Sequence, residues 1–348
     1  MMIKTELPQT LLQQLPLEKG VNPIFPASTI SLRRNLASPL FPSKCTPQEL
    51  EQIALDIQDA LQEAHYLALP SQRLTPLDKE FLFEHFLWVE KVQNPSLFLL
   101  DPLSHLLILI NGSDHLQFHL LNSQEEIEAR YATIAEIEKK IATLGFAFSP
   151  QFGHLTSQPE YSGTGLTITN YLHLPALIQT GSIQEILDKQ QSEETTVSSM
   201  EGDKNFVGNL LLLRNRYRQG VTEESILRVL QETRERLMLS EEAMRTKLKI
   251  APSPEIQDAI YRAYGILMNS YQLETRETLS LLSMIQLGLE LGLLTGVPKN
   301  KPIELFFTCR KAHLTYHLLP KYIPLHELSH KRAEYIHNEL RELKALFN

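Results

Sequence analysis

The chain has 348 residues, 43% hydrophobic and 21% charged, a composition typical of a globular protein with a sizeable buried core. A formal net charge of -8 argues against a nucleic-acid-binding protein driven by bulk charge, and two cysteines are too few for a disulfide framework or a zinc cluster. No apolar run approaches the roughly 18 residues that span a bilayer, and no signal peptide is visible, so we expect a cytoplasmic protein without membrane association.

The first part of the chain mixes helix and strand signals. Residues 1–21 predict an irregular lead-in, and residues 28–42 predict a strand or loop. Thr46, Pro47 and Glu49 are typical of a helix start with a capping box, which predicts a helix to about residue 65. We predict further elements in chain order: a helix over 76–93, strands over 97–100 and 105–110, a turn at 111–112, and a half-buried strand over 116–120.

The middle of the chain continues this alternation. Ser123 and Glu126 indicate a second capping box, and Gly145 indicates the end of that helix. Beyond it we predict a glycine loop over 156–165, a strand over 166–173, a helix over 175–189, a polar mobile loop over 190–204, a strand over 209–218 and a long helix over 222–249.

A proline-rich linker over 251–254 divides the chain. The sequence after it is mainly helical, although 303–307 is compatible with one strand. We therefore predict a lead-in over 1–21, a domain over 22–250 and a helical domain over 255–348. The expected fold class is α+β, with an antiparallel sheet flanked by helices and a small, mainly helical C-terminal domain.

Metal and thiol chemistry are not favoured. His115 and His119 are four residues apart on a predicted strand, where such residues lie about 13 Å apart and cannot share one ion. Cys45 precedes a helix start and Cys309 lies in the helical tail, so both are interpreted as ordinary small residues of the core. No phosphate-binding loop motif occurs. We expect no metal.

Residues 152–159, 163–166 and 172–177 carry the strongest motif. They resemble the FGYLTSCPTNxGTGLR…LHLPAL segment of the guanidino (phosphagen) kinases, and are most similar to the bacterial McsB-type protein arginine kinases. Further motifs follow in family order: residues 28–42 resemble SSRIRLARNL…FP, 111–117 resemble NEEDHLR, 208–223 resemble GNxxQISNQxTLGxSE, 261–267 resemble RAxGIL, and 286–292 resemble RLGxxxG. The resemblance implies a guanidino-kinase fold from about residue 22 onward.

The resemblance also implies an active site, and this chain departs from it. Phosphoryl transfer needs positive charge on the phosphates and a carboxylate that orients the nucleophile. The catalytic glutamate falls on Ser113 and the reactive cysteine on Gln158. The phosphate-binding arginines fall on Thr29, Ser31, Gln117, Thr167 and Val197.

Two further departures concern a loop and a nucleotide contact. The second glutamate of the family falls near Gly202, although Glu201 could replace it if the loop slips by one residue. The nucleotide-contacting histidine falls on Val92. The chain therefore keeps the motifs of the fold while most of the residues that carry the chemistry are replaced.

Three arginines supply a possible new feature. Arg214, Arg216 and Arg218 would share one face of the strand predicted over 209–218, by its period of two. In the family this strand floors the nucleotide cleft, so the three side chains are a candidate face for an anion or an acidic partner. The alternative is a solvated face, or arginines paired with nearby glutamates.

The C-terminal domain departs as well. In the family it mediates dimerisation and carries a phosphoarginine-reading motif, RDxxRAxxIR. Here Leu328 and Ser329 replace the Arg-Asp pair and His337 replaces the last arginine, while Arg332 is kept. Phosphoarginine reading is not expected from this set, whereas a homodimer remains the expectation.

Two hypotheses follow. The favoured one is a catalytically degenerate protein arginine kinase homologue, a pseudokinase that acts as a binding, scaffold or regulatory protein and needs no cofactor. Its partner would be a protein, for example an activator or adaptor of the arginine kinase system, and neither nucleic acid nor membrane. The alternative is an active ATP-dependent protein arginine kinase with a rebuilt pocket, which would use Mg and ATP.

Overall fold

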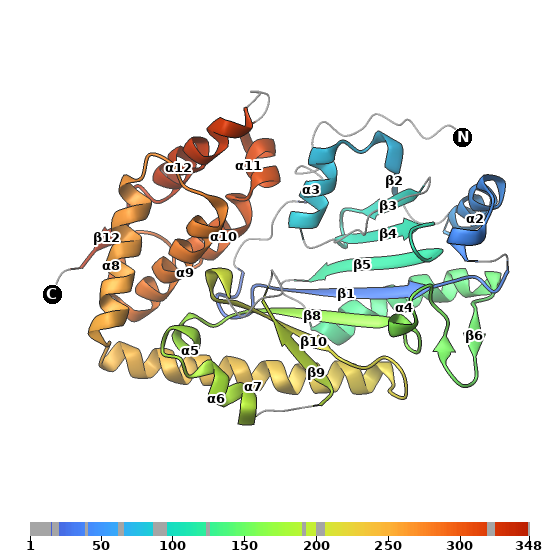
Figure 1. The fold of residues 1–348 in the computed structure, drawn as a ribbon, viewed down its shortest axis with the longest axis horizontal. Coiled ribbons are helices and arrows are strands. Elements are labelled where there is room, and N and C mark those ends of the chain that lie inside the picture. Colours follow the sequence, from blue (N-terminus) through green and yellow to red (C-terminus); the bar gives the residue numbers. More distant parts are fainter. Residues whose placement is uncertain are drawn as a thin grey trace. The chain divides into compact units, whose positions relative to one another are not determined.

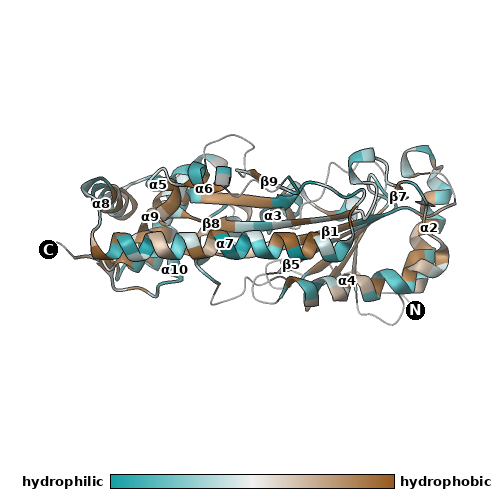
Figure 2. Cartoon of the chain, turned by 90° about the horizontal axis from the view of Figure 1, so that it is seen from below, coloured by the Kyte–Doolittle hydropathy of each residue, from teal (hydrophilic) through white to brown (hydrophobic). Residues whose placement is uncertain are grey.

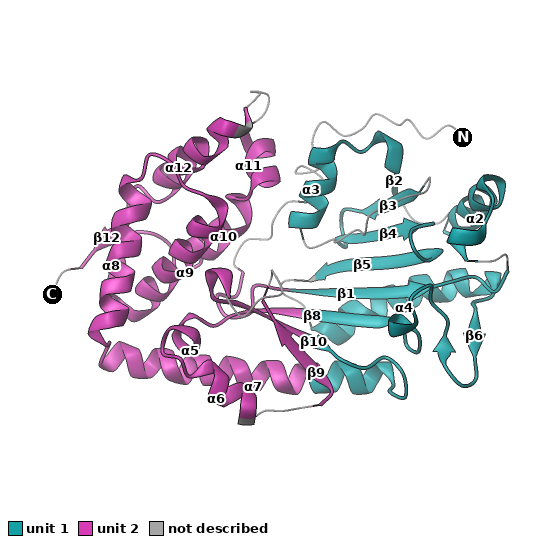
Figure 3. Ribbon diagram, viewed as in Figure 1, with its two compact units in different colours: residues 1–16, 28–169, 214–229 teal, residues 17–27, 170–213, 230–348 magenta. Residues whose placement is uncertain are grey.

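The computed structural model describes residues 15, 21–38, 41–61, 66–85, 96–122, 126–189, 193–199, 206–318 and 324–346. The chain forms two compact units (Figure 3). Unit 1 comprises residues 1–16, 28–169 and 214–229, and unit 2 comprises residues 17–27, 170–213 and 230–348. The segments of each unit are far apart in the sequence, because strands and helices from several parts of the chain build each core.

The central sheet has eight strands in the order β2-β3-β4-β5-β1-β8-β10-β9 (Figure 1). Neighbours from β2 to β1 in this order pair antiparallel. The bounds are β1 (Ala27–Arg34), β2 (Leu67–Pro70), β3 (Leu97–Asp101), β4 (Leu106–Ile110), β5 (Leu116–Asn122), β8 (Leu166–His173), β9 (Thr195–Ser198) and β10 (Leu210–Asn215). The predicted fold class, an antiparallel sheet flanked by helices with a helical C-terminal region, is confirmed.

The register of β1 and β5 brings polar positions together. Arg33 lies opposite Gln117, and Ser31 lies opposite His119. The strand prediction for 116–120 is confirmed, but its half-buried character is wrong, since Gln117 and His119 are buried as well as the apolar residues Leu116, Phe118 and Leu120. Both faces of β5 are therefore covered.

Unit 1 contains α2 (Pro47–Ala60), α3 (Pro76–Glu84), α4 (Ile127–Ile141) and the first part of α7 (Glu223–Ile250). Thr46 and Glu49 form the predicted capping box, with both reciprocal hydrogen bonds present. The helix ends at Ala60, earlier than predicted, and α3 ends at Glu84. The predicted capping box is wrong at Glu126, because α4 begins after this residue and its side chain makes no cap hydrogen bond, while Ser123 lies outside the described residues.

A short hairpin and two strand predictions complete this region. β6 (Phe148–Ser149) pairs with β7 (Gly153–His154). The strand predicted over 166–173 is confirmed as β8. The strand predicted over 209–218 is too long, because β10 ends at Asn215. The Asn215 amide donates to the carbonyls of Leu166 and Tyr217, which turns the chain away from the sheet at that point.

Three predictions for unit 2 need correction. The helix over 175–189 is two helices, since Gly181 between them has φ +71°. The loop over 190–204 contains β9, and parts of this range lie outside the described residues. Residues 303–307 are helical rather than a strand, because a helix with Pro302 in its first turn begins at Lys301. The helices and short strands are α5 (Pro175–Gln179), α6 (Ile183–Lys189), α8 (Pro254–Asn269), α9 (Thr275–Leu291), α10 (Lys301–Thr308), α11 (Lys311–Leu318), α12 (Leu328–Glu339), β11 (Leu294–Thr295) and β12 (Lys344–Ala345).

The predicted long helix is α7 (Glu223–Ile250). Hydrophilic and hydrophobic residues alternate along it (Figure 2), as expected of a helix with one face on a core. In the part of the chain that the structure describes, no helix combines the length and apolar character needed to cross a membrane.

A buried network of hydrogen bonds connects the LHLPAL motif to α9 within unit 2. The Pro23 carbonyl accepts from His173 Nδ1 (3.0 Å), so His173 Nε2 is the acceptor for the Ser283 hydroxyl (2.7 Å). The Asn209 amide donates to the same hydroxyl oxygen (2.6 Å) and accepts from Gln179. Burial lowers the pKa of His173 to about 3, with a further contribution from Arg245. The imidazole is therefore a neutral structural group.

A second buried group in unit 2 holds the start of α5. The carboxylate of Glu241 accepts hydrogen bonds from the backbone N–H groups of Ala176 and Leu177, both at 3.0 Å. Arg245 pairs with it at 2.8 Å, and the Glu241 side chain is fully buried. A carboxylate at a helix N-terminus satisfies N–H groups that lack partners within the helix.

Candidate functional site

Several positions implied by the resemblance lie on adjacent strands of unit 1. Thr29, Ser31 and Arg33 alternate along β1, and Gln117 lies opposite Arg33 on β5. Ser113 lies in the turn before β5, and Thr167 lies on β8, the other neighbour of β1. The fold therefore places these positions, which are far apart in the sequence, on three neighbouring strands and one turn.

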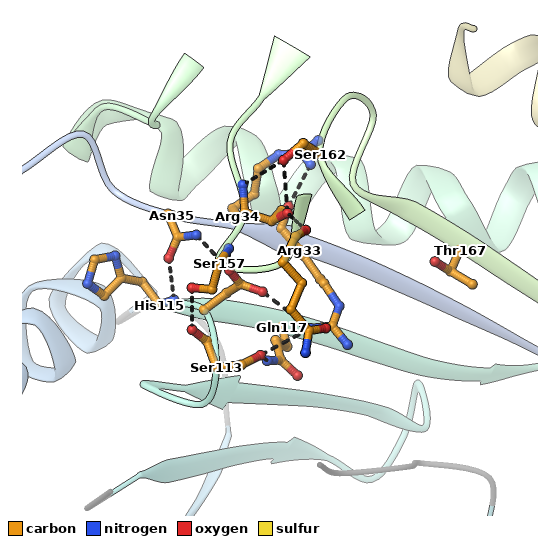
Figure 4. Close-up of polar contacts among 12 residues, drawn as sticks. Arg33, Arg34, Asn35, Ser113, His115, Gln117, Ser157, Ser162 and Thr167 are labelled. Carbon is orange, nitrogen blue, oxygen red and sulfur yellow. Dashed lines mark hydrogen bonds and ion pairs between the residues drawn. The ribbon is translucent and has the colours of Figure 1, made fainter. Parts of the chain in front are cut away.

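Ser113, Gln117 and Arg33 form a hydrogen-bonded cluster (Figure 4). The Ser113 hydroxyl accepts from Gln117 Nε2 at 2.7 Å and from Arg33 Nη1 at 3.1 Å. Gln117 Oε1 is buried and has no hydrogen-bond partner among the described residues. The positions at which the resemblance implies the catalytic glutamate and one arginine are thus occupied by neutral groups that bind each other.

Asp114 is the carboxylate next to this cluster, and it is fully buried. One oxygen accepts from Asn35 and from the Ser157 backbone N–H, both at 2.7 Å, and the other pairs with Arg33 at 3.3 Å. The Ser157 hydroxyl donates to the Ser113 carbonyl at 2.6 Å. These contacts fix the glycine loop against the turn before β5, which is a structural role.

The glycine loop has the conformation that its sequence predicted. Gly163 has φ +109° and Gly165 has φ +66°. A Cβ atom on Gly163 would lie 2.1 Å from the carbonyl oxygen of Arg218, so only glycine allows this approach. Thr164 N–H donates to the same carbonyl at 2.8 Å. The carbonyl of Gln158 accepts from the Thr156 hydroxyl at 2.6 Å, which closes the loop on itself.

Arg34 is a structural arginine. It is 2% exposed, forms an ion pair with Glu138 and donates to the carbonyls of Arg33 and Thr164, both at 2.8 Å. The family's own RNL motif contains this residue. It therefore cannot replace the phosphate-binding arginines at positions 29 and 31.

Arg214 on β10 and Arg218 in the segment after it lie against β8. Arg218 Nε donates to the Thr167 hydroxyl at 2.9 Å, and Arg214 Nε donates to the Thr169 hydroxyl at 3.1 Å. The guanidinium carbon atoms of Arg218 and Arg33 lie 5.0 and 4.0 Å from the centre of the Tyr161 ring. Burial lowers the pKa of Arg218, and the charges of Arg33 and Arg214 lower it further.

Arg216 differs from the other two arginines. It is exposed, lies 5.5 Å from the centre of the Tyr217 ring and offers its carbonyl to Arg218. The three arginines therefore divide into a half-buried pair, Arg214 and Arg218, and one solvated residue. Sequence reasoning overlooked Tyr161, although an aromatic residue two positions before Gly163 in a glycine loop is a signal of a possible contact.

The other positions that the resemblance assigns to the kinase site do not lie on these three strands of unit 1. Val197 lies on β9 in unit 2 and is partly exposed. Val92, Glu201 and Gly202 lie outside the described residues.

Residues 328–337, which resemble the phosphoarginine-reading motif, pack within unit 2. Arg332 is 2% exposed and donates to the carbonyls of Cys309 (2.8 Å) and Leu273 (2.6 Å). Leu328 is buried, Ser329 donates to Glu274 at 2.6 Å, and the Nε2 atom of His337 is buried. The arginine kept at this motif thus holds the domain together.

Histidine and cysteine side chains meet at one place in unit 1. Leu36 N–H donates to His115 Nδ1 at 3.1 Å, so Nε2 carries the proton in the neutral ring and faces Cys45 Sγ at 3.9 Å. Burial raises the pKa of the Cys45 thiol, which disfavours a reactive thiolate. Within the described ranges, no three His, Cys, Asp or Glu side chains are grouped as metal ligands.

Comparison with known proteins gives consistent matches over most of the chain. The sequence model described as ATP:guanido phosphotransferase, C-terminal catalytic domain, matches residues 48–244, and the protein-arginine kinase McsB C-terminal domain matches residues 253–347. A protein-arginine kinase of Chlamydia pneumoniae is 35% identical, covering 88% of this chain and 89% of that protein. One from Halothermothrix orenii is 30% identical, covering 90% and 92%.

Solved structures show the same fold. A lombricine kinase has a TM-score of 0.56 at 17% identity and covers 64% of this chain and 67% of its own. The duplicated taurocyamine kinase of Schistosoma mansoni has a TM-score of 0.56 at 19% identity and covers 73% of this chain and 38% of its own. The guanidino-kinase fold predicted from the motifs is therefore confirmed.

Proposed function

Because the chain belongs to the ATP:guanido phosphotransferase family, within the McsB-type protein-arginine kinases, we propose that it is a member that binds a partner without transferring phosphate. The observation that carries the proposal is Ser113 at the position of the catalytic glutamate. Its hydroxyl accepts hydrogen bonds from Gln117 and Arg33. A hydroxyl does not offer the charge or the basicity with which a carboxylate orients a guanidinium nucleophile.

The neighbouring carboxylate does not replace the lost one. Both oxygens of Asp114 are held by donors from Arg33, Asn35 and Ser157, and the side chain is fully buried. A catalytic base must reach the proton that it accepts. Asp114 would have to break the contacts that fix the glycine loop before it could do so.

The phosphate-binding charge of the family is also missing from its own positions. Thr29, Ser31, Gln117 and Thr167 replace four arginines. A cationic clamp residue in phosphoryl transfer contributes about 10³-fold or more in rate. Four such losses together with the carboxylate support a protein without measurable transfer.

We further propose that the chain forms a homodimer and binds a protein partner. A chain that keeps the fold of a kinase, and both matched domains, while its chemistry is replaced is suited to a scaffold or regulatory role. An activator or adaptor of the arginine kinase system is the candidate partner, and the cytoplasm is the proposed location.

The alternative is an active kinase with a rebuilt pocket that uses Mg and ATP. Arg214 and Arg218 favour it, because they place guanidinium groups next to Thr167 and Thr169 of β8. Against this alternative, the described residues of the Ser113 cluster include no carboxylate that could orient the nucleophile.

A transfer assay separates the two functions. The protein is incubated with labelled ATP, Mg and an arginine-rich protein, and acid-labile phosphate on the acceptor is measured. We expect incorporation at the level of a sample without enzyme. The protein-arginine kinase of Clostridium acetobutylicum, 27% identical to this chain, serves as the positive control. Incorporation that is abolished in an Arg214→Gln, Arg218→Gln double variant would establish the alternative.

A further inference from the structure

Positive charge near β8 has changed position rather than disappeared. The family pattern has arginine at position 167, serine at 214 and threonine at 218, whereas this chain has threonine at 167 and arginine at 214 and 218. Arg218 Nε donates to the Thr167 hydroxyl at 2.9 Å. A guanidinium group from the segment after β10 thus lies at the residue where the family has its own arginine.

Arg214 and Arg218 have donors to spare. An arginine carries five N–H donors. Arg214 uses Nε for the Thr169 hydroxyl, and Arg218 uses Nε for Thr167 and Nη1 for the carbonyl of Arg216. Within the described part of the chain, no carboxylate lies at ion-pair distance from either guanidinium group. Both are half-buried, so solvent neutralises them less than it would a surface arginine.

A third cation, Arg33, lies close to this pair. Arg33 and Arg218 both lie against the Tyr161 ring, at 4.0 and 5.0 Å from its centre. Asp114 pairs with Arg33, and the exposed Glu160 acts on Arg218 only from beyond ion-pair distance. Burial lowers the pKa of Arg218 most, and the positive charges of Arg33 and Arg214 lower it further. An anion between these three positive charges would relieve their repulsion.

We propose that Arg214 and Arg218 form a binding site for a phosphoryl group, with Tyr161 and Arg33 at its border. The inference rests on the proposed function, because it names the ligand class that the non-transferring site binds. The ligand is a phosphate dianion because guanidinium groups bind phosphate oxygens in a bidentate manner, and because two charges offset more repulsion than one carboxylate does. Inorganic phosphate and a nucleotide polyphosphate both present this group.

Calorimetric titration tests the site with three probes: inorganic phosphate, inorganic pyrophosphate and ATP without Mg. We expect the wild-type chain to bind pyrophosphate, and Arg214→Gln and Arg218→Gln each to weaken binding by about ten-fold. Arg216→Gln is the matched control, because it removes the same charge from an exposed position and should leave the affinity within about two-fold. ATP that binds more tightly than pyrophosphate identifies a nucleotide as the source, and equal affinities identify the phosphate group alone.

An exchange variant tests the position of the charge. Thr167→Arg combined with Arg218→Thr returns the guanidinium group to β8, and it should restore most of the affinity lost in Arg218→Thr alone. The Arg218→Lys variant keeps the positive charge at this position. A thermal unfolding curve for every variant shows whether that variant is folded, so a loss of binding can be distinguished from a loss of folding. No pyrophosphate binding at millimolar concentration, or an Arg216→Gln effect equal to that of Arg218→Gln, would overturn the inference.

The outcomes separate this inference from the proposed function. Binding that depends on Arg214 and Arg218, without acid-labile phosphate on arginine, supports both. Transfer that depends on the same arginines would overturn the proposed function and keep the site. Absence of both binding and transfer would overturn the site and leave the proposed function in place.

Discussion

Two buried polar clusters, one in each unit, differ in how fully their groups are satisfied. In unit 2, His173, Ser283 and Asn209 bind one another, and Glu241 accepts two backbone N–H groups as well as Arg245. In unit 1, Gln117 Oε1 is buried with no hydrogen-bond partner among the described residues. Arg214 and Arg218 keep unused donors. The difference teaches that the cluster around His173 and Glu241 is fully paired, whereas the cluster around Ser113 is not; elsewhere in unit 2, Asn170 and Gln286 Oε1 are also buried without a hydrogen-bond partner among the described residues.

This contrast agrees with the physical cost of each change. An unsatisfied buried polar group costs about 1 to 3 kcal/mol, and an unpaired buried charge costs more. Several such losses in the hydrogen bonds that hold the fold together would unfold a protein of ordinary stability. A site that has lost its chemistry, as we propose for the Ser113 cluster, can tolerate such losses, because residues that serve chemistry are not selected for stability. Four substitutions, from the largest expected effect to the smallest, test the contrast.

Glu241→Ala should have the largest effect. It would leave Arg245 buried without its carboxylate, and it would remove the acceptor for the Ala176 and Leu177 N–H groups. We expect a loss of about 4 kcal/mol in the free energy of unfolding, measured by urea denaturation. Glu242→Ala, at the exposed neighbouring position, should change it by less than about 0.5 kcal/mol. Equal effects at 241 and 242 would show that the buried carboxylate is not needed.

Acid should weaken the His173 network. The pKa of His173 is about 3 in the folded state and about 6.5 when unfolded, so the unfolded chain binds more protons between these values. The stability contributed by neutral His173 is complete above about pH 6.5 and is lost as the pH falls toward 3. We expect the difference in unfolding free energy between wild type and His173→Gln to shrink by about 3 kcal/mol from pH 6.5 to about 4. His326→Gln, at an exposed histidine, should show no such change.

Gly163→Ala tests the loop of the replaced site. The added Cβ would lie 2.1 Å from the Arg218 carbonyl oxygen at a φ of +109°. We expect a loss of about 2 kcal/mol in stability and weaker pyrophosphate binding, since the Arg218 backbone must move. Gly181→Ala has a φ of +71° but open space around its Cβ, so it should lose only about 1 kcal/mol and leave binding unchanged. Unaltered pyrophosphate binding by Gly163→Ala would contradict the coupling of the loop to Arg218.

Tyr161→Leu should have the smallest effect. It removes the ring that lies against the guanidinium groups of Arg33 and Arg218. Each such contact contributes about 0.5 to 2 kcal/mol, so we expect a loss of about 1 kcal/mol in stability. Tyr161→Phe keeps the ring and should behave like wild type in thermal unfolding. A phenylalanine variant as weak as the leucine variant would assign the effect to the hydroxyl instead.

The sequence predicted those parts of the fold that depend on local signals. The capping box of Thr46 and Glu49, the bounds of β8 and the length of α7 follow from residues that are near one another in the chain. The family motifs then supplied the fold class, because they describe a known arrangement of such elements. Local patterns were misleading where one residue decided the outcome, as Gly181 does between α5 and α6.

The contacts of the site were beyond local reasoning. The hydrogen bond from Arg33 to Ser113 joins residues 80 positions apart, and that from Arg218 to Thr167 joins residues 51 apart. The period of a strand placed Arg214, Arg216 and Arg218 together, but β10 ends at Asn215. Only the three-dimensional arrangement separates the half-buried pair of arginines from the exposed one and adds Tyr161 to them.

The hydrogen bond between Arg218 and Thr167 also sets an order for mutations. An arginine at 167 beside the present Arg218 would place two guanidinium groups together without a carboxylate between them, which is unfavourable. A sequence that starts with arginine at 167 therefore reaches arginine at 218 most readily by losing the first charge before gaining the second. Such a path passes through a sequence that has neither charge. Restoring the family arrangement by design should follow the same path in reverse, with Arg218 removed before Thr167 is changed.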